Sequence, residues 1–181
     1  KEILAIEHQK LSLLNDVNQI NSILNFELAC FKYKETVLSR PLTESFSLKF
    51  RLSPCVTTYE SDWNWFIMQD SVPNERMNTI LLQPEKDYYF ALQQTGTYDL
   101  PTSSNVLELE LTVFEFFILS LFEKPSTISA VIQAFEEEFE CKTMEEQKQL
   151  RVNAEALIRI LIFQMFIVAH KQTAPSSKVI Q

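Results

Sequence analysis

Apolar residues near the start of the chain recur at the spacing of an amphipathic helix. From Ile3 to Phe26 they lie three, four or seven positions apart, which places them on one helical face. A second helix is predicted over Glu27–Val37. It should end near Arg40 and Pro41, because the residue before a proline is disfavoured in the α region.

The next segments carry the patterns of short strands. Residues Phe46–Leu52 alternate apolar and polar side chains, which predicts a half-buried strand. Val56–Tyr59 and Trp63–Met68 are rich in β-branched and aromatic residues, which favours two further short strands. Asp70–Asn78, which contains a proline, is predicted to be a loop.

A second group of three strands is predicted after this loop. Thr79–Leu82 and Asp87–Leu92 read as a pair joined by a proline-containing turn, and Thr95–Asn105 reads as a longer exposed loop. Val106–Leu111 alternates again and is the third strand of the group.

Three helices are predicted after the last strand. Thr112 and Glu115 form a capping-box pattern that begins a helix over Val113–Phe122. A second helix is expected over Ser126–Phe139, with its first residue as the N-cap. The third is expected over about Met144–Gln164.

These elements predict an α+β protein with two parts and a tail. N-terminal helices and short antiparallel strands precede an orderly unit of three strands and three helices. We place a boundary near residue 75, so that residues 1–75 form an extension, which is a candidate region for docking an enzyme. Residues 76–171 then form the three-strand, three-helix unit, and residues 172–181 a flexible tail.

Composition narrows the functional classes. The chain has 181 residues, of which 46% are hydrophobic, and this is enough for a packed core. The apolar runs are shorter than the ~20 residues of a membrane span, and the first residues lack the pattern of a secretory signal, so a cytoplasmic protein is expected. A formal net charge of -8 disfavours nucleic acids and anionic membranes as partners. The single glycine, Gly96, argues against phosphate-binding loops.

The residues that most often carry catalysis or bind metals are few and scattered. His8 and His170 are the only histidines and lie at opposite ends of the chain. Cys30, Cys55 and Cys141 form no CxxC pair and no paired framework. We therefore expect free thiols, no metal site and no catalytic group in this chain.

Acidic residues concentrate in the second half of the chain. Between residues 105 and 140 eight glutamates face one base, Lys124; they are Glu108, Glu110, Glu115, Glu123, Glu136, Glu137, Glu138 and Glu140. Such a field attracts a basic peptide, although an acidic surface that only aids solubility is the alternative. Consecutive glutamates on a helix point in different directions, so Glu136 to Glu140 are not read as a cation site.

Two stretches carry a resemblance to a known family. The segments LTVFEFFILSLFEKPSTISAVIQAFEEEFE and NAEALIRILIFQMFIVAH follow three predicted strands. This order, over about Asn78 to His170, resembles the winged-helix peptide-recognition element of ribosomal peptide (RiPP) biosynthesis. The chain departs from that pattern because Met165 and Phe166 replace the glycine common after the third helix, and because some 75 residues precede the unit.

An N-terminal extension joined to such an element resembles the partner subunit of the multinuclear non-haem iron oxidases, most closely the C component in methanobactin biosynthesis. The resemblance implies a non-catalytic accessory subunit in a heterodimer. It would hold the leader of a precursor peptide, partly by strand addition, while the partner enzyme oxidises a core cysteine. The iron would belong to the partner, and this chain would hold no cofactor.

The resemblance also places a peptide-binding groove. An edge strand beside a helix suits strand addition, since unpaired main-chain groups are satisfied by the incoming peptide. We assign this groove to one strand and one helix, with the residues Val106, Glu108, Glu110, Arg151, Glu155 and Arg159. Glu108 and Glu110 share one strand face and are expected to attract basic side chains of the peptide.

Three other functions remain as alternatives. A winged-helix transcription regulator would share the helical order, but residues from Ser126 to Glu140 contain no Lys or Arg for phosphate contacts. A purely structural subunit could instead dock onto an enzyme through the N-terminal half and exposed aromatic residues. An independent enzyme is the third.

Overall fold

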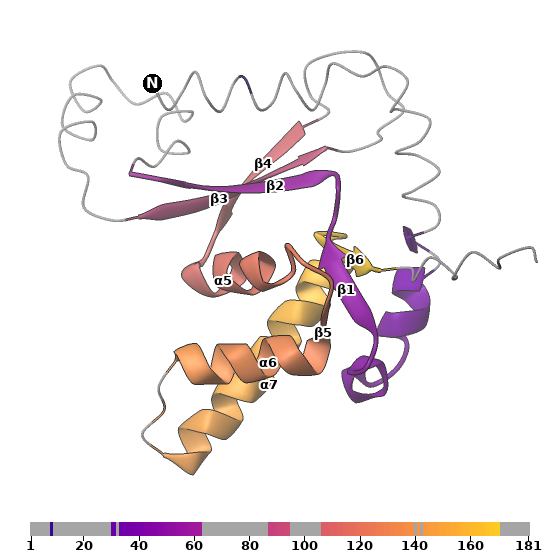
Figure 1. Cartoon of the computed structure of the whole chain (residues 1–181), viewed down its shortest axis with the longest axis vertical. Coiled ribbons are helices and arrows are strands. Elements are labelled where there is room, and N and C mark those ends of the chain that lie inside the picture. Colours follow the sequence, from indigo (N-terminus) through magenta and orange to yellow (C-terminus); the bar gives the residue numbers. More distant parts are fainter. Residues whose placement is uncertain are drawn as a thin grey trace, which may run out of the picture. The chain divides into compact units, whose positions relative to one another are not determined.

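The computed structural model describes residues 8, 30–31, 33–62, 87–94, 106–139, 141 and 143–170. They form helices and antiparallel strands, so the chain is an α+β protein, as predicted. It divides into two compact units (Figure 1). Unit 1 comprises Lys1–Ala29 and Ser53–Ser120, and unit 2 comprises Cys30–Leu52 and Leu121–Gln181.

The sheet of unit 1 consists of three consecutive antiparallel strands. They are β2 (Val56–Ser61), β3 (Tyr88–Gln94) and β4 (Val106–Leu111), in the order β2-β3-β4. Phe90 and its neighbour Ala91 point to opposite sheet faces, and both are fully buried. The central strand is therefore covered on both faces, which accounts for its nearly continuous apolar sequence.

Helix α5 (Val113–Leu121) follows β4 directly and lies against one face of this sheet (Figure 1). The Thr112 hydroxyl accepts from the Glu115 backbone N–H at 3.2 Å, and the Thr112 backbone N–H donates to the Glu115 carboxylate at 2.8 Å. This confirms the predicted capping box. The rings of Tyr89 and Phe116 pack with their centroids 4.5 Å apart and join the helix to the sheet.

Unit 2 builds its sheet from three segments that lie far apart in the sequence. The order is β5 (Ser126–Thr127), β1 (Lys49–Leu52) and β6 (Ile167–Ala169), with β1 antiparallel to both neighbours. Phe50 of the central strand is paired with Ser126 on one side and with Ala169 on the other. Its side chain is 1% exposed, so the central strand also anchors the core.

Helices α6 (Ile128–Glu138) and α7 (Met144–Phe163) pack across one another beside this sheet (Figure 1). Their positions confirm the second and third predicted helices. Thr143 and Glu146 form a capping box at the start of α7. The buried residues of both helices recur at helical spacing. The largest fully buried side chains of unit 2 are Phe50, Phe122, Phe135, Phe166, Ile128, Ile132, Ile158 and Leu161.

The turn after α7 has the hydrogen bonds of a Schellman motif. The backbone N–H of Phe166 donates to the Leu161 carbonyl at 2.9 Å, and that of Met165 donates to Ile162 at 3.1 Å. Met165 has a φ of 61°, a left-handed conformation that favours glycine. Met165, which replaces the glycine expected after the third helix, thus adopts a turn of the type that glycine favours.

Three predicted details differ from the structure. Residues 30–31 and 33–38 are helical as expected, but a 3-10 helix, η1 (Leu42–Ser45), follows Pro41. The strand predicted from Phe46 begins only at Lys49, because residues 46–48 turn between η1 and β1. The N-cap of α6 is Thr127, whose hydroxyl accepts from the Ala130 backbone N–H; Ser126 belongs to β5.

Several predicted elements lie outside the described residues. They include most of the first helix, the strands Trp63–Met68 and Thr79–Leu82, the loops Asp70–Asn78 and Thr95–Asn105, the boundary near residue 75, and the tail. β3 and β4 belong to unit 1, whereas α6 and α7 belong to unit 2. The winged-helix arrangement of residues 76–171 stays a prediction.

Candidate functional site

The outer side of β4 is the candidate site in unit 1. β4 pairs with β3 along its length, from Val106 opposite Gln94 to Leu111 opposite Tyr89. Within the described residues, no strand pairs with the other side of β4. Every second backbone N–H and carbonyl of a strand points to such a side. An extended segment that lies alongside a strand pairs with groups of this kind.

The two faces of β4 have different chemistry, as the alternation in sequence predicted. Glu108 and Glu110 lie opposite Leu92 and Phe90 and share their face. Glu110 is exposed and Glu108 is half-buried. The other face carries leucines, so a segment added beside β4 would meet carboxylates on one face and apolar side chains on the other.

Burial along the leucine face falls with distance from α5. Leu111 is buried, Leu109 is half-buried, and Leu107 is 47% exposed. Leu111 is the register partner of Tyr89, whose ring packs against Phe116 of α5. The helix therefore covers the Leu111 end of the strand and leaves the Leu107 side chain accessible for an apolar contact.

The predicted helix residues lie on α7, in unit 2. Arg151 is placed between two carboxylates: Glu136 of α6 at 3.8 Å and Glu155, one turn further along α7, at 3.4 Å. Both pairs are partly exposed, so each contributes little to stability. Together they join the polar surfaces of the two helices.

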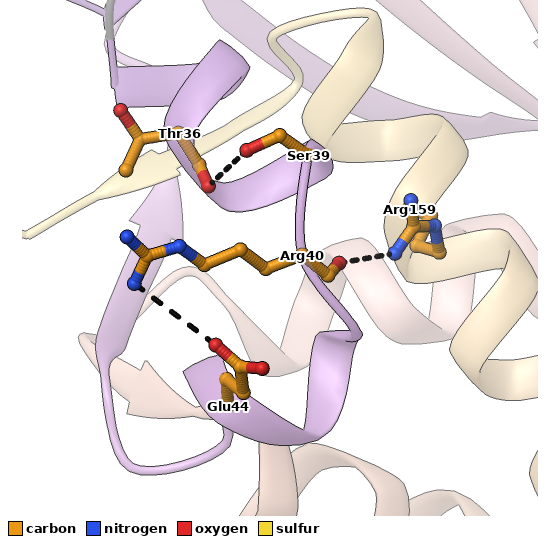
Figure 2. A network of polar contacts seen from close by, with 5 residues as sticks. All are labelled: Thr36, Ser39, Arg40, Glu44 and Arg159. Carbon is orange, nitrogen blue, oxygen red and sulfur yellow. Dashed lines mark hydrogen bonds and ion pairs between the residues drawn. The ribbon is translucent and has the colours of Figure 1, made fainter.

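Arg159 has a different environment, at the end of the helix formed by residues 33–38. Its guanidinium donates to the backbone carbonyls of Leu38 at 2.9 Å and Arg40 at 3.1 Å. Figure 2 shows the second of these contacts beside the 4.0 Å ion pair of Arg40 with Glu44. Carbonyls at a helix C-terminus lack intrahelical partners, so a cation there stabilises the end of the helix.

The six predicted site residues form two sets. Val106, Glu108 and Glu110 lie together on β4 of unit 1, and Arg151, Glu155 and Arg159 lie together on α7 of unit 2. Both sets occupy the elements expected for them. A single groove formed by both sets stays a prediction.

The structure also shows an aromatic cluster that the sequence reasoning missed. The Lys34 ammonium lies 4.8 Å from the ring centroids of both Phe31 and Phe163, and it donates to the Phe163 carbonyl at 3.1 Å. Phe31 and Lys34 are three positions apart on a helix, which was the only signal in sequence that the two side chains meet. The cation interacts with both rings and with the C-terminal end of α7.

Among the described residues, Tyr89 and Tyr33 have raised pKa values. Burial is the larger cause of the raised pKa of Tyr89, and the negative charges of Glu60 and Asp87 raise it further. Glu60 is the register partner of Tyr89 across β2 and β3. The pKa of Tyr33, which packs edge-on against Phe50, is raised by burial. Neither arrangement supplies a base near neutral pH.

Comparisons with known proteins identify no relative: no protein-family model, curated protein or solved structure matches the chain. Within the described ranges, no three His, Cys, Asp or Glu side chains are grouped so that they could hold a metal ion. Among the helices that the structure describes, none is both long and apolar enough to cross a bilayer. The local chemistry of β4 and α7 is therefore the basis for any functional assignment.

Proposed function

We propose that the chain is a non-catalytic subunit that binds a peptide by strand addition to the outer side of β4. The observation that carries this proposal is the position of β4: it ends the β2-β3-β4 order among the described strands. A central strand that is buried on both faces gives β4 a rigid support. A bound peptide would continue an existing ladder, so little of the binding site needs to be ordered on binding.

The chemistry of β4 supports a basic and apolar peptide. Main-chain hydrogen bonds supply the part of the affinity that does not depend on sequence, and alternate side chains supply the specificity. Leu107 offers an apolar contact, while Glu108 and Glu110 lie on the opposite face. Each exposed charge contact contributes about 0.2 to 1 kcal/mol. The carboxylates therefore contribute more to the choice between peptides than to the total binding affinity.

The resemblance to the peptide-recognition elements of ribosomal peptide biosynthesis supports a more specific form of the proposal. The bound peptide would be the leader of a precursor, and its cysteine-containing core would be oxidised by an iron-dependent partner enzyme. The chain would form a heterodimer with that enzyme, in the cytoplasm, and would contribute no iron ligand. The acidic field of residues 105–140 agrees with a basic leader.

Hydrogen exchange tests the position of the peptide. Mass spectrometry of the chain with and without a saturating precursor peptide should show slower amide exchange in Val106–Leu111, because strand addition protects amides on that edge. Strand β6 (Ile167–Ala169), which belongs to unit 2, should exchange at an unchanged rate. Binding with protection confined to other segments would remove β4 from the site.

Charge reversal tests the recognition. Replacing both Glu108 and Glu110 by Lys should weaken binding roughly three- to tenfold in calorimetry, since two exposed charge contacts are lost. The matched control replaces two exposed glutamates of the same acidic field, Glu123 and Glu138, by Lys. Equal losses in the two variants would indicate a general field effect. An unchanged affinity in the first variant would exclude both carboxylates from the site.

A further inference from the structure

The solvent side of α7 carries an apolar stripe that the proposed function does not use. Val152, Ala156, Ile160 and Phe163 are spaced by four, four and three residues, which places them on one face of the helix. All four are exposed, and the three larger side chains are 51%, 45% and 63% accessible. The buried residues of α7 lie on the opposite side, at Ala154, Ile158, Leu161 and Ile162.

The two ends of this stripe carry opposite charges. Glu145, at the start of α7, is seven residues before Val152 and so lies on the same face. At the other end Lys34 rests against the rings of Phe31 and Phe163. The rise of a helix places these ends about 27 Å apart along the axis. A carboxylate therefore lies at one end of this face and an ammonium at the other, with Lys148, Gln149 and then the apolar stripe between them.

We propose that this face binds a second copy of the same chain, with the two α7 helices antiparallel about a two-fold axis. A surface with this polarity is complementary to itself only when the second helix runs in the reverse direction. Each Glu145 then lies beside Lys34 of the other copy, and both ends of the interface pair opposite charges.

In the register that pairs the charges, the centre of the interface is apolar. When residue 145 lies opposite residue 163, the symmetry axis falls near position 154, so Val152 meets Ala156 of the other copy. The small side chain of Ala156 at the centre lets the helix backbones approach. The larger Ile160 and Phe163 lie on either side, opposite Lys148 and Glu145 of the other copy. The spacing of four, four and three spans 11 residues, which is the repeat of helices that pack along one another with a right-handed supercoil.

The contacts of Lys34 favour this occupant. Because the ammonium is held against both rings and the Phe163 carbonyl, its charge is fixed at the end of the stripe before association. An acidic side chain that approaches Phe163 meets this charge directly. Glu145 of a second copy arrives there when Val152 meets Ala156. This association does not depend on peptide binding at β4.

Sedimentation equilibrium of the intact chain over a range of concentrations tests the proposal. The expected result is a reversible monomer–dimer equilibrium, and Val152→Asp should raise the dimer dissociation constant at least about tenfold by placing a charge in the centre of the stripe. The matched control is Leu48→Asp, at an exposed leucine directly before β1 of unit 2, which should leave the equilibrium unchanged. Circular dichroism verifies that both variants are folded.

A charge exchange tests the antiparallel register. Glu145→Lys and Lys34→Glu should each weaken the dimer, because each places like charges together at both ends. The double variant should regain most of the wild-type affinity, since the exchanged charges pair again. A parallel pairing gives no such recovery, so a double variant weaker than both single variants would overturn the proposal. A wild-type chain that stays monomeric up to about 1 mM would also overturn it, and would leave the stripe to a different protein.

Discussion

The two units form three-stranded antiparallel sheets in different ways. In unit 1 the strands are consecutive, and β3 and β4 pair along six register positions. In unit 2 the strands have two to four residues, and β1 pairs with segments near residues 126 and 168. The first sheet has a long side for pairing, whereas the second depends on the helices packed beside it.

This difference separates the surfaces that the units offer. A strand of six residues with one side open within the described chain presents main-chain groups, which suits an extended peptide. Unit 2 presents a helix whose outer face is apolar, which suits another helix. The comparison predicts that changes in one unit leave the function and stability of the other nearly intact.

The largest effect is expected when the side chain of one buried phenylalanine is removed. Phe50→Ala should destabilise unit 2 by about 3 to 5 kcal/mol, because Phe50 is buried at the centre of its sheet. Hydrogen exchange should then become faster in α6 and α7 and stay unchanged in β3. Phe90→Ala is the matched change in unit 1 and should give the opposite pattern. Faster exchange in both units from either variant would mean that they unfold as one.

A smaller effect is expected from Arg159, which connects α7 to the segment before β1. Arg159→Ala should lower the free energy of unfolding by about 1.5 to 3 kcal/mol, because two backbone carbonyls lose a charged donor. The control is Arg151→Ala, whose exposed ion pairs should contribute only about 0.2 to 1 kcal/mol. Denaturant titration measures both. Equal losses would show that the carbonyl contacts of Arg159 contribute nothing beyond a surface charge.

A stabilising change is expected at the end of α7. Met165→Gly should raise the stability of unit 2 by about 1 kcal/mol, since glycine adopts a positive φ without the steric cost of a side chain. Gln164→Gly, one position earlier, has an α-helical backbone and should be destabilising instead. Thermal unfolding of the two variants should therefore shift in opposite directions, and a loss of stability in Met165→Gly would contradict the steric account.

The smallest effect concerns the two tyrosines, one in each unit. Glu60→Gln should lower the pKa of Tyr89 toward its ordinary value and leave the pKa of Tyr33 unchanged, because only Tyr89 faces that charge. Ultraviolet difference titration measures both, with Tyr89→Phe and Tyr33→Phe to assign the signals. A shift of the Tyr33 signal in Glu60→Gln would contradict the assignment.

The raised pKa values of these tyrosines also determine the direction in which stability changes with pH. Because the folded pKa of each tyrosine exceeds the unfolded value of 10.0, the unfolded state releases its proton first. The contribution of each tyrosine to stability is therefore complete below that value and is lost as the pH rises through the folded pKa. Glu60→Gln should reduce the part of this alkaline loss that belongs to unit 1.

Local patterns predicted most of the helices and strands among the described residues. Residue preferences gave β2, the preceding turn gave β3 and alternation gave β4, and the capping box of Thr112 and Glu115 gave the start of α5 at Val113. The start of α6 was missed by one residue because Ser126 and Thr127 are both good caps, and Ser126 is drawn into pairing with Phe50. The six candidate residues were correctly placed on one strand and one helix. The spacing of these residues did not indicate which contacts their side chains would make.

Periodicity and capping by themselves determined the α+β class, the long helix α7 and the two chemical faces of β4, because each depends on residues within a few positions of one another. Only the tertiary structure decided that residue 50 pairs with residues 126 and 169, that Arg159 binds the carbonyls of Leu38 and Arg40, and that Lys34 lies between two rings. These contacts join segments as far as about 130 residues apart, and many alternative pairings satisfy the same local patterns. Their choice depends on the packing of the whole unit.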